Sequence, residues 1–257
     1  MGQVMKVAKR RQLILDLIHS GNTNVETLCG HLGVSEATVR RDLTALAEQG
    51  LIMRIYGGAA HIGTREPEAS LQERSGHFSS DKARIARAAL AHIEDHDTIL
   101  LDGGTSTAAL AKLLGQRRGL HVITNNLLAA TALGELPEGR VTLLGGDLRS
   151  SSMATFGPAA MAVLERLTAD KVFVSADGVV AGRGLCEASA GQSYLKERMI
   201  QQAAAVFILA DASKLGRDRQ QYWTPLNTPW TLITYRASAD LLAPFEADPW
   251  SHVEQAG

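Results

Sequence analysis

The chain has 257 residues, a hydrophobic fraction of 45% and a formal net charge of −1, which predicts about two globular domains with sizeable cores. No apolar run reaches the roughly 18 residues of a membrane span, and the first residues show no signal-peptide pattern. Cys29 and Cys186 are isolated, which indicates neither a disulfide framework nor a metal site and favours the reducing cytoplasm.

The charge is unevenly distributed along the chain. Residues 1–65 contain eight lysines and arginines against five acids, a balance of +3, whereas the remainder contains 18 against 22, a balance of −4. A basic amino-terminal part followed by an acidic body indicates a DNA-binding domain joined to a second domain. Because +3 is modest, a single head is expected to bind weakly, so that several heads must act together.

The amino-terminal residues predict a helix-turn-helix. Apolar residues repeat with helical spacing over residues 6–20, which predicts a first helix. Thr23 and Glu26 have the spacing of a capping box, which predicts a short second helix ending near Leu32. Gly33 then provides the tight turn into a third helix, and two helices joined by such a turn form the DNA-binding motif.

The third helix is predicted to run from Ser35, as its N-cap, to Gly50, as its stop. Val39, Leu43 and Leu46 fall at i, i+4 and i+7 and form one apolar face. The opposite face is narrow and cationic, so it fits a major groove, where arginine reaches phosphates or guanine and threonine contacts either bases or phosphates. An ordinary surface helix with solvated arginines is the alternative.

Two short strands are expected to follow, over residues 51–56 and 59–62, around a Gly57-Gly58 hairpin turn. Three helices followed by a hairpin form a winged helix, with Arg54 and His61 on or near the wing. The residues that we expect to contact DNA are Ser35, Ala37, Thr38, Arg40, Arg41, Thr44 and Arg54.

The stretches QLILDLI and SEATVRRDLTALAEQGLIMRIYGGA resemble the amino-terminal signature of the DeoR family of bacterial sugar-responsive repressors. The resemblance is dense over residues 10–60. It implies that residues 35–48 are the recognition helix and that Arg40 and Arg41 contact DNA. It also implies repression rather than activation.

Residues 63–80 are polar, contain one proline and show no sustained period, so they are predicted to be a linker, ordered in part around Leu71 and Phe78. Members of the family carry an arginine and a lysine in this region, and Arg74 and Lys82 match them. The resemblance suggests interdomain packing as their role.

From residue 81 onward, short apolar runs alternate with helical stretches. The runs are 99–101, 122–123, 141–144, 172–174, 206–209 and 232–233, and the helical stretches are 82–93, 105–114, 127–133, 158–167 and 193–204. This alternation predicts a mainly parallel, Rossmann-like sheet covered on both faces. The predicted fold is therefore α/β: a winged helix-turn-helix domain at residues 1–62, a linker at 63–80, and an α/β effector-sensing domain at 81–257.

Ligands of such sheets bind beyond the carboxyl ends of the strands. The DGGTST stretch at 102–107 brings two glycines and three hydroxyls to a helix start and is a candidate phosphate cradle; a tight turn with a threonine cap is the alternative. It is neither G-x-G-x-x-G nor a Walker loop, so no nucleotide is indicated. Polar loops follow other strands at Asn125, Asp147, Asp177 and Lys214, and Lys214 is the best candidate to neutralise a phosphate.

The stretches LLDGGTST, VITNN, LLGGDLR and LADASKLG resemble the DeoR-family sensor domain, which is similar to the folds of ribose-5-phosphate isomerase and glucosamine-6-phosphate deaminase. The resemblance implies a phosphorylated sugar or related metabolite as effector. Cys186 stands where the family often has threonine, and the usual acidic residue before Tyr194 is missing, so the effector's identity stays open. Together with the cradle, the implied effector contacts are Asp102, Gly103, Gly104, Thr105, Ser106, Thr107, Asn125, Lys196 and Lys214.

Two other function classes compete with this prediction. A sugar-phosphate isomerase or deaminase needs a positioned base, and Glu187 or Asp102 is available, but no catalytic pair or triad emerges. A NAD-sensing repressor is disfavoured because the dinucleotide fingerprint is absent. We therefore expect a cytoplasmic, non-enzymatic repressor of a carbohydrate-catabolism operon that binds double-stranded DNA as a homo-oligomer, a dimer or tetramer, with no membrane, metal or cofactor.

Overall fold

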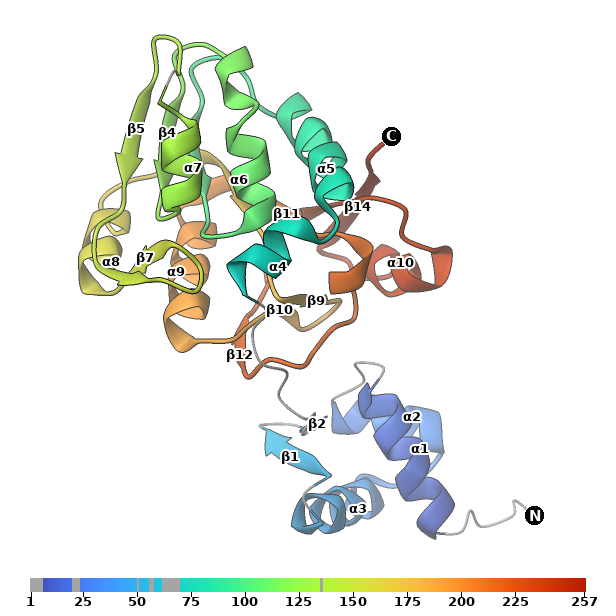
Figure 1. The fold of residues 1–257 in the computed structure, drawn as a ribbon. Helices are drawn as coiled ribbons and strands as arrows, with labels where there is room; N and C mark the ends of the chain where they lie inside the picture. The colour runs from blue at the N-terminus through green and yellow to red at the C-terminus, as the bar shows by residue number, and fades with distance from the viewer. Residues whose placement is uncertain (1–6, 20–23, 50, 56–57, 62–69, 135) are drawn as a thin grey trace. The chain divides into compact units, whose positions relative to one another are not determined.

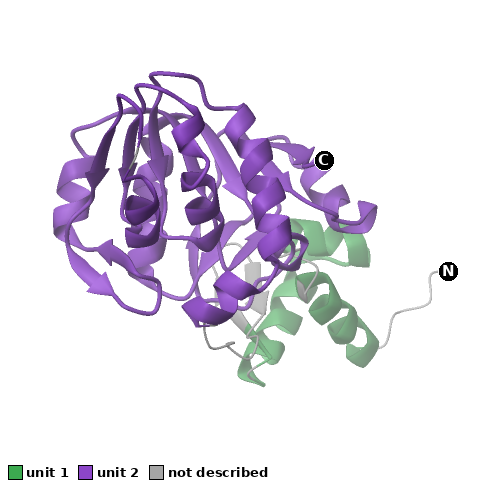
Figure 2. Ribbon diagram, turned by 45° about the horizontal axis from the view of Figure 1, so that its top comes forward, with its two compact units in different colours: residues 1–66 green, residues 67–257 purple. Residues whose placement is uncertain are grey.

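The computed structural model describes residues 7–19, 24–49, 51–55, 58–61, 70–134 and 136–257. The chain divides into two compact units, residues 1–66 and residues 67–257 (Figure 2). Each unit has hydrophobic clusters of its own, so each is described by itself.

The described part of unit 1 has three helices and a hairpin (Figure 1). These elements are α1 (Val7–His19), α2 (Val25–Leu32), α3 (Glu36–Glu48), β1 (Ile52–Ile55) and β2 (Gly58–His61). The two strands pair antiparallel, with Ile55 opposite Gly58. Fully buried side chains from each helix and from β1, among them Ile14, Leu28, Leu43 and Ile52, form one core, and this arrangement is the predicted winged helix-turn-helix.

The helix ends differ in detail from the prediction. The N-cap of α2 is Asn24, whose Oδ1 accepts a hydrogen bond of 2.8 Å from the amide of Glu26. The predicted cap Thr23 and the predicted stop Gly50 lie outside the described residues. Ser35 does precede α3, but its hydroxyl lies 3.0 Å from that of Thr38 and caps no amide.

Unit 2 is built on a seven-stranded sheet in which every neighbouring pair is parallel. The strand order is β14-β13-β11-β8-β3-β4-β5. The strands are β3 (Thr98–Leu101), β4 (His121–Thr124), β5 (Arg140–Leu143), β8 (Ala169–Val174), β11 (Ala203–Leu209), β13 (Trp230–Thr234) and β14 (Ser251–Gln255). The α/β prediction is thus confirmed, and the six predicted runs fall on or beside six of these strands.

Helices cover both faces of this sheet, as Figure 1 shows. A hydrophobic core lies on each face of the sheet, and alternate residues of β3 belong to different cores. Ile99 and Leu101 pack in the core with α5, α6 and α7, whereas Leu100 packs in the core with α8, α9 and α10. None of the helices in the described part of the chain combines the length and the hydropathy of a membrane span. The helices are α4 (Leu71–Gly76), α5 (Ser79–Ala91), α6 (Thr105–Ala111), α7 (Leu127–Ala132), α8 (Pro158–Leu164), α9 (Ala190–Gln201) and α10 (Ala239–Glu246), with 3-10 turns η1 (Leu114–Gln116) and η2 (Ala212–Lys214).

Several short elements had no predicted counterpart. Two small antiparallel sheets consist of strands of three or four residues, which carry too little pattern to be seen in the sequence. These strands are β6 (Asp147–Arg149), β7 (Ala154–Phe156), β9 (Gly178–Val180), β10 (Gly184–Glu187) and β12 (Tyr222–Thr224). Residues 71–76, expected within the linker, form α4, and its capping box of Ser70 and Glu73 was the one available signal.

Candidate functional site

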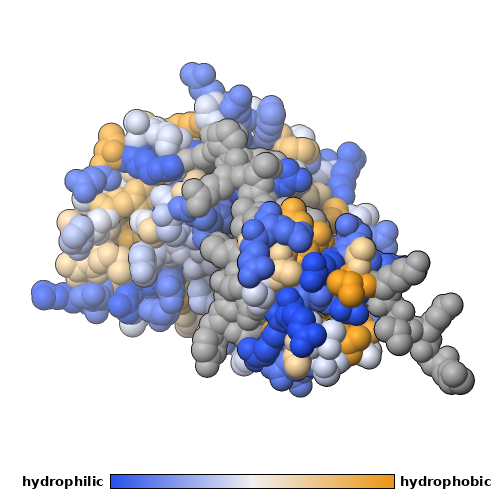
Figure 3. Space-filling model, turned by 90° about the horizontal axis from the view of Figure 1, so that it is seen from below, coloured by the Kyte–Doolittle hydropathy of each residue, from blue (hydrophilic) through white to orange (hydrophobic). Residues whose placement is uncertain are grey.

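Helix α3 buries one face and exposes the other. Val39 and Leu43 are fully buried and Leu46 nearly so, because they form the stripe that packs in the core of unit 1. On the opposite side, side chains are exposed or partly exposed. The part of the surface nearest the viewer in Figure 3 shows strongly hydrophilic residues next to hydrophobic ones. The residues of this outer set that the structure describes are Ser35, Ala37, Thr38, Arg40, Arg41 and Thr44.

The two arginines of α3 differ in their surroundings. Arg40 Nε donates to Glu36 Oε1 at 2.9 Å, one helical turn away. Arg41 is exposed and pairs with no carboxylate among the described residues. The hydroxyl of Thr44 donates to the carbonyl of Arg40 at 2.9 Å. The side chain of the seventh predicted DNA contact, Arg54, lies outside what the structure describes, although its backbone belongs to β1.

A carboxylate that sequence reasoning missed fixes α3 against α1. Asp42 is 2% exposed, and its two oxygens accept hydrogen bonds from Arg10 Nε at 2.6 Å and Arg11 Nε at 3.0 Å. Burial raises the pKa of Asp42, but the hydrogen bonds and charges of the two arginines outweigh it and hold the pKa below its usual value. The contacts of Asp42 with Arg10 and Arg11 therefore orient α3, whose opposite face carries the exposed arginines.

A pocket lies at the carboxyl edge of the large sheet, where the loops after β3, β8 and β11 meet. It thus occupies the place where open α/β sheets bind ligands. Asn125 is not among its lining residues but lines a smaller cavity with Asp102, Gly103 and Lys196. The predicted effector residues that line the main pocket are Gly103, Gly104, Thr105, Ser106, Lys196 and Lys214.

The other two predicted contacts, Asp102 and Thr107, are buried beneath the loop. The hydroxyl of Thr107 lies 3.0 Å from Asp102 Oδ1 and 3.2 Å from the amide of Gly104. The other carboxylate oxygen of Asp102 accepts a hydrogen bond of 3.1 Å from the amide of Ser175. These contacts fix the loop between β3 and α6, so both residues shape the pocket from below.

Packing explains both glycines of this loop. A Cβ on Gly104 would lie 1.7 Å from Ser175 Oγ, and one on Gly103 would lie 2.7 Å from the Cβ of Ala154. Either clash would force the loop away from its neighbours. The glycines therefore serve the close approach of β7 and of the loop after β8, whereas the sequence had suggested the close approach of a ligand.

Lys196 is a buried charge and not the solvated helix lysine that is usual in proteins. It is 7% exposed and forms ion pairs with Glu187 and, at 3.2 Å, with Asp102. Burial lowers the pKa of Lys196, but the two carboxylates outweigh it and raise it overall. Glu187 is almost fully buried, and this burial raises its pKa to about 8 against the opposing effect of Lys196.

Four cationic side chains besides Lys196 line the pocket, five in all, and the four are Arg74, Lys82, Lys214 and Arg217. Burial is the main cause of the lowered pKa of both Lys82 and Lys214, and neighbouring cations lower each further against nearby aspartates. Lys82 is 6% exposed and donates hydrogen bonds to the carbonyls of Arg74 and, at 2.9 Å, His77. Such crowding of positive charge favours an anionic ligand.

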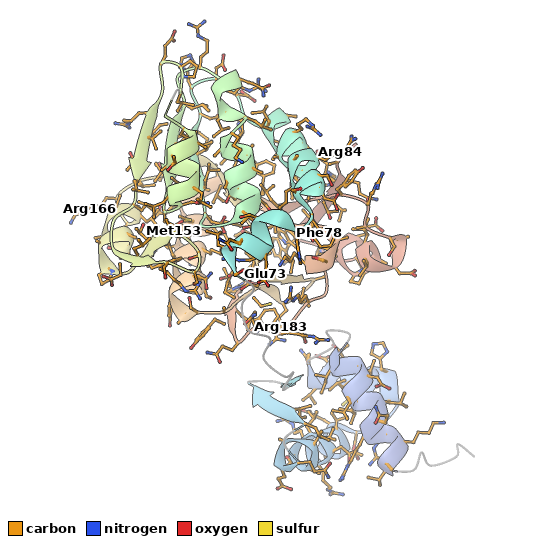
Figure 4. All side chains as sticks on the ribbon, viewed as in Figure 1. Glu73, Phe78, Arg84, Met153, Arg166 and Arg183 are labelled. Atoms are coloured by element: carbon orange, nitrogen blue, oxygen red, sulfur yellow. The ribbon has the colours of Figure 1, made fainter. Side chains whose placement is uncertain are left out.

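The segment from α4 to α5 also contributes to this pocket. Glu73 and Phe78 mark its course in Figure 4. Phe78 has a left-handed backbone with φ of 54° and a side chain that is 48% exposed. The family resemblance suggests interdomain packing as the role of Arg74 and Lys82, and within unit 2 both line the pocket.

Sequence comparisons match both units. The model of the DeoR-like helix-turn-helix domain matches residues 10–65, and that of the DeoR C-terminal sensor domain matches residues 77–236. The chain is 33% identical to the HTH-type transcriptional regulator GlpR of Haloferax volcanii, over 83% of this chain and 84% of that protein. It is 32% identical to the glycerol-3-phosphate regulon repressor of Escherichia coli, over 83% and 85%.

A third relative, the HTH-type transcriptional repressor GlcR of Bacillus subtilis, is 34% identical over 91% of this chain and 92% of that protein. Among solved structures, ribose-5-phosphate isomerase A of Methanocaldococcus jannaschii aligns with 53% of this chain and 54% of that chain. That alignment has a TM-score of 0.40 and 19% identity, values too low to support an argument about activity.

Proposed function

The chain belongs to the DeoR family of helix-turn-helix transcriptional regulators, and on that basis we propose that it represses a carbohydrate-catabolism operon and releases its operator when a phosphorylated sugar or related metabolite binds. The observation that carries the effector half of this proposal is the pocket with five cationic side chains at the carboxyl edge of the sheet. An isomerase-like enzyme is the weaker candidate, because the relatives compared above are regulators.

Each part of the chain has its own role in such a regulator. Residues 1–62 read double-stranded DNA, with α3 in the major groove. Residues 81–257 hold the effector and the contacts between subunits of a homo-oligomer, and the protein acts in the cytoplasm. The proposed effector ligands are the six predicted residues that line the pocket, together with Asn125, while Asp102 and Thr107 support them.

A thermal-shift screen of phosphorylated sugars tests the effector assignment, because a ligand that binds the native state raises the apparent melting temperature. Each compound that stabilises the protein is then added to an operator complex in a gel-shift titration. Release of the operator without conversion of the compound supports a repressor. Turnover of the compound would favour the enzyme instead, and the absence of any stabilising sugar phosphate contradicts the proposal.

Replacing Arg41 by alanine should weaken operator binding and leave unit 1 folded, because Arg41 lies on the exposed face of α3. If Arg41 contacts guanine, the loss should be about 1–3 kcal/mol with relaxed specificity at one base. If it contacts phosphate, the loss should be uniform across sequences, with a shallower salt dependence. Unchanged binding in a gel-shift titration would remove Arg41 from the interface.

Replacing Lys214 by alanine should lower effector affinity about ten- to a hundredfold, because a charge-assisted contact is worth roughly 1.5–3 kcal/mol. Operator binding without effector should survive, since Lys214 belongs to unit 2. The expected result is a repressor that needs far more effector to release DNA. Release at the wild-type effector concentration would show that Lys214 is not a ligand; failure to bind DNA at all would show a structural role. Thr105→Val should act similarly but more mildly.

A further inference from the structure

Acidic as well as cationic side chains line the pocket. The three acids are Asp177 from the loop after β8, Glu187 from β10 and Asp211 from the loop after β11. A phosphate group suits the cations and is repelled by the acids, so each acid must have another purpose, either within the fold or toward the rest of the ligand. Asp211 has its purpose within the fold, because its Oδ1 accepts hydrogen bonds from the amide of Ser213 at 3.1 Å and from the hydroxyl of the same residue.

Glu187 has its purpose within the fold. Lys196 forms an ion pair with it, and the same ammonium reaches Asp102 at 3.2 Å. Asp102 in turn accepts hydrogen bonds from the hydroxyl of Thr107 at 3.0 Å and from the amide of Ser175 at 3.1 Å. Both carboxylates thus pair with Lys196, at the wall of the pocket that Glu187 and Lys196 line.

Asp177 differs from Asp102 and Glu187, which both pair with Lys196. It is 8% exposed, it lines the pocket, and its Oδ2 has no hydrogen-bond partner among the described residues. Its charge acts on Lys214, where it opposes the effect of burial on the pKa of that lysine. A buried carboxylate oxygen without a donor costs free energy, so a donor supplied by the ligand stabilises the bound state.

We propose that Asp177 selects the part of the effector that carries hydroxyl groups: its carboxylate accepts a hydrogen bond from a hydroxyl of a phosphate ester whose phosphate lies toward Lys82 and Lys214. This inference rests on the proposed function and narrows it. The effector is a polyol phosphate, by which we mean a phosphate ester whose hydroxyl-bearing part is uncharged, such as an aldose, ketose or glycerol phosphate. A phosphorylated sugar acid is rejected, because its carboxylate would face that of Asp177.

The experiment measures dissociation constants of the full-length protein by calorimetry. The probes are inorganic phosphate, 6-phosphogluconate, and glucose 6-phosphate, fructose 1-phosphate, ribose 5-phosphate and glycerol 3-phosphate. The variants are Asp177→Ala and Asp177→Asn, with Asp218→Ala as the matched control, since Asp218 is an acid of the same unit that does not line the pocket. Melting temperatures of all variants establish that each is folded.

The expected result is a change of opposite sign for different ligands. For the polyol phosphate that wild type binds, Asp177→Ala lowers the affinity by about ten- to a hundredfold. Asp177→Asn lowers the same affinity by a smaller factor. Both variants bind inorganic phosphate and 6-phosphogluconate as tightly as wild type or more tightly, because a repelling charge is gone. Asp218→Ala changes none of these values.

Two results would overturn the inference alone: an unchanged affinity for the polyol phosphate, or an equal loss for the polyol phosphate and inorganic phosphate, which would indicate a structural role for Asp177. A third result, in which wild type binds 6-phosphogluconate but none of the polyol phosphates, would also overturn the inference alone. If wild type binds none of the phosphorylated compounds, the proposed function fails with it. The two failures are therefore distinguishable from the wild-type titrations.

Discussion

Unit 1 is expected to lose about 3–5 kcal/mol of folding free energy when Asp42 is replaced by alanine, because one partner of a buried ion pair is removed. The substitution leaves Arg10, itself 9% exposed, without the carboxylate that it contacts at 2.6 Å. A loss of this size is a large fraction of the stability of a small domain. Urea denaturation of residues 1–66, followed by circular dichroism, measures it.

The matched control for this prediction is Glu36→Ala, which removes a carboxylate from the same helix. Glu36 and Arg40 are both more than half exposed, and exposed pairs of this kind contribute little to stability. The control should therefore leave the urea midpoint nearly unchanged. If Asp42→Ala costs no more than Glu36→Ala, the buried contacts do not hold α3 in place.

The stabilising effect of Asp42 should depend on pH in a defined direction. Against the effect of burial, the two arginines hold the pKa of Asp42 in the folded protein below the ordinary value of an aspartate, so the unfolded chain binds this proton more readily than the folded one. The contribution is therefore complete above about pH 4 and is lost as the pH falls through the folded pKa. An acid titration of residues 1–66 should show a steeper loss of stability for wild type than for Asp42→Ala.

The second large effect concerns assembly. An isolated fragment of residues 1–62 should bind the operator about a hundred- to ten-thousandfold more weakly than the full chain, since linked heads gain affinity from effective concentration. The physical reasons are the balance of only +3 in residues 1–65 and the spacing of paired heads by about one DNA turn in dimeric helix-turn-helix proteins. Subunit contacts are assigned to residues 81–257.

Gel-shift titrations of the fragment and the full chain on the same operator, at one salt concentration, compare the two affinities. Circular dichroism of the fragment establishes that it is folded, as its own hydrophobic core predicts. Sedimentation of the full chain gives its oligomeric state. Equal affinities for the fragment and the full chain would contradict the assembly proposal. So would a full chain that is monomeric and still binds the operator about a hundredfold or more tightly than the fragment.

Periodic apolar residues explain why so much of the fold could be predicted. The buried stripe of α3 and the apolar runs of β3, β8 and β11 are long enough to leave a pattern, and parallel strands buried on both faces read as continuous hydrophobic runs. The positions of the loops after β3 and β11 then followed from the sheet. Six of the predicted effector residues consequently lie at one pocket.

Polar pairing could not be predicted in the same way. The partners of Asp42 lie 32 and 31 residues away in the sequence, and Lys196 of α9 meets Asp102, which directly follows β3 much earlier in the chain. No local pattern marks such contacts. The same holds for Lys82, for which the resemblance suggests interdomain packing, but which is buried and donates a hydrogen bond to the carbonyl of His77, the residue after α4.

Polar contacts, and not buried apolar side chains, hold helix α4 in place. It has six residues, none of them buried, and polar contacts hold it: its capping box, the bond of 2.8 Å from Arg74 to the carbonyl of Ser151, and the bonds from Lys82. Detachment of α4 exposes little apolar surface. The change in heat capacity on opening is therefore small, and the free energy of opening depends little on denaturant concentration. In native-state hydrogen exchange, the amides of Arg74 and His77, which bond within α4 at 2.9 and 2.8 Å, should therefore exchange through a local opening that urea barely accelerates, long before the sheet unfolds.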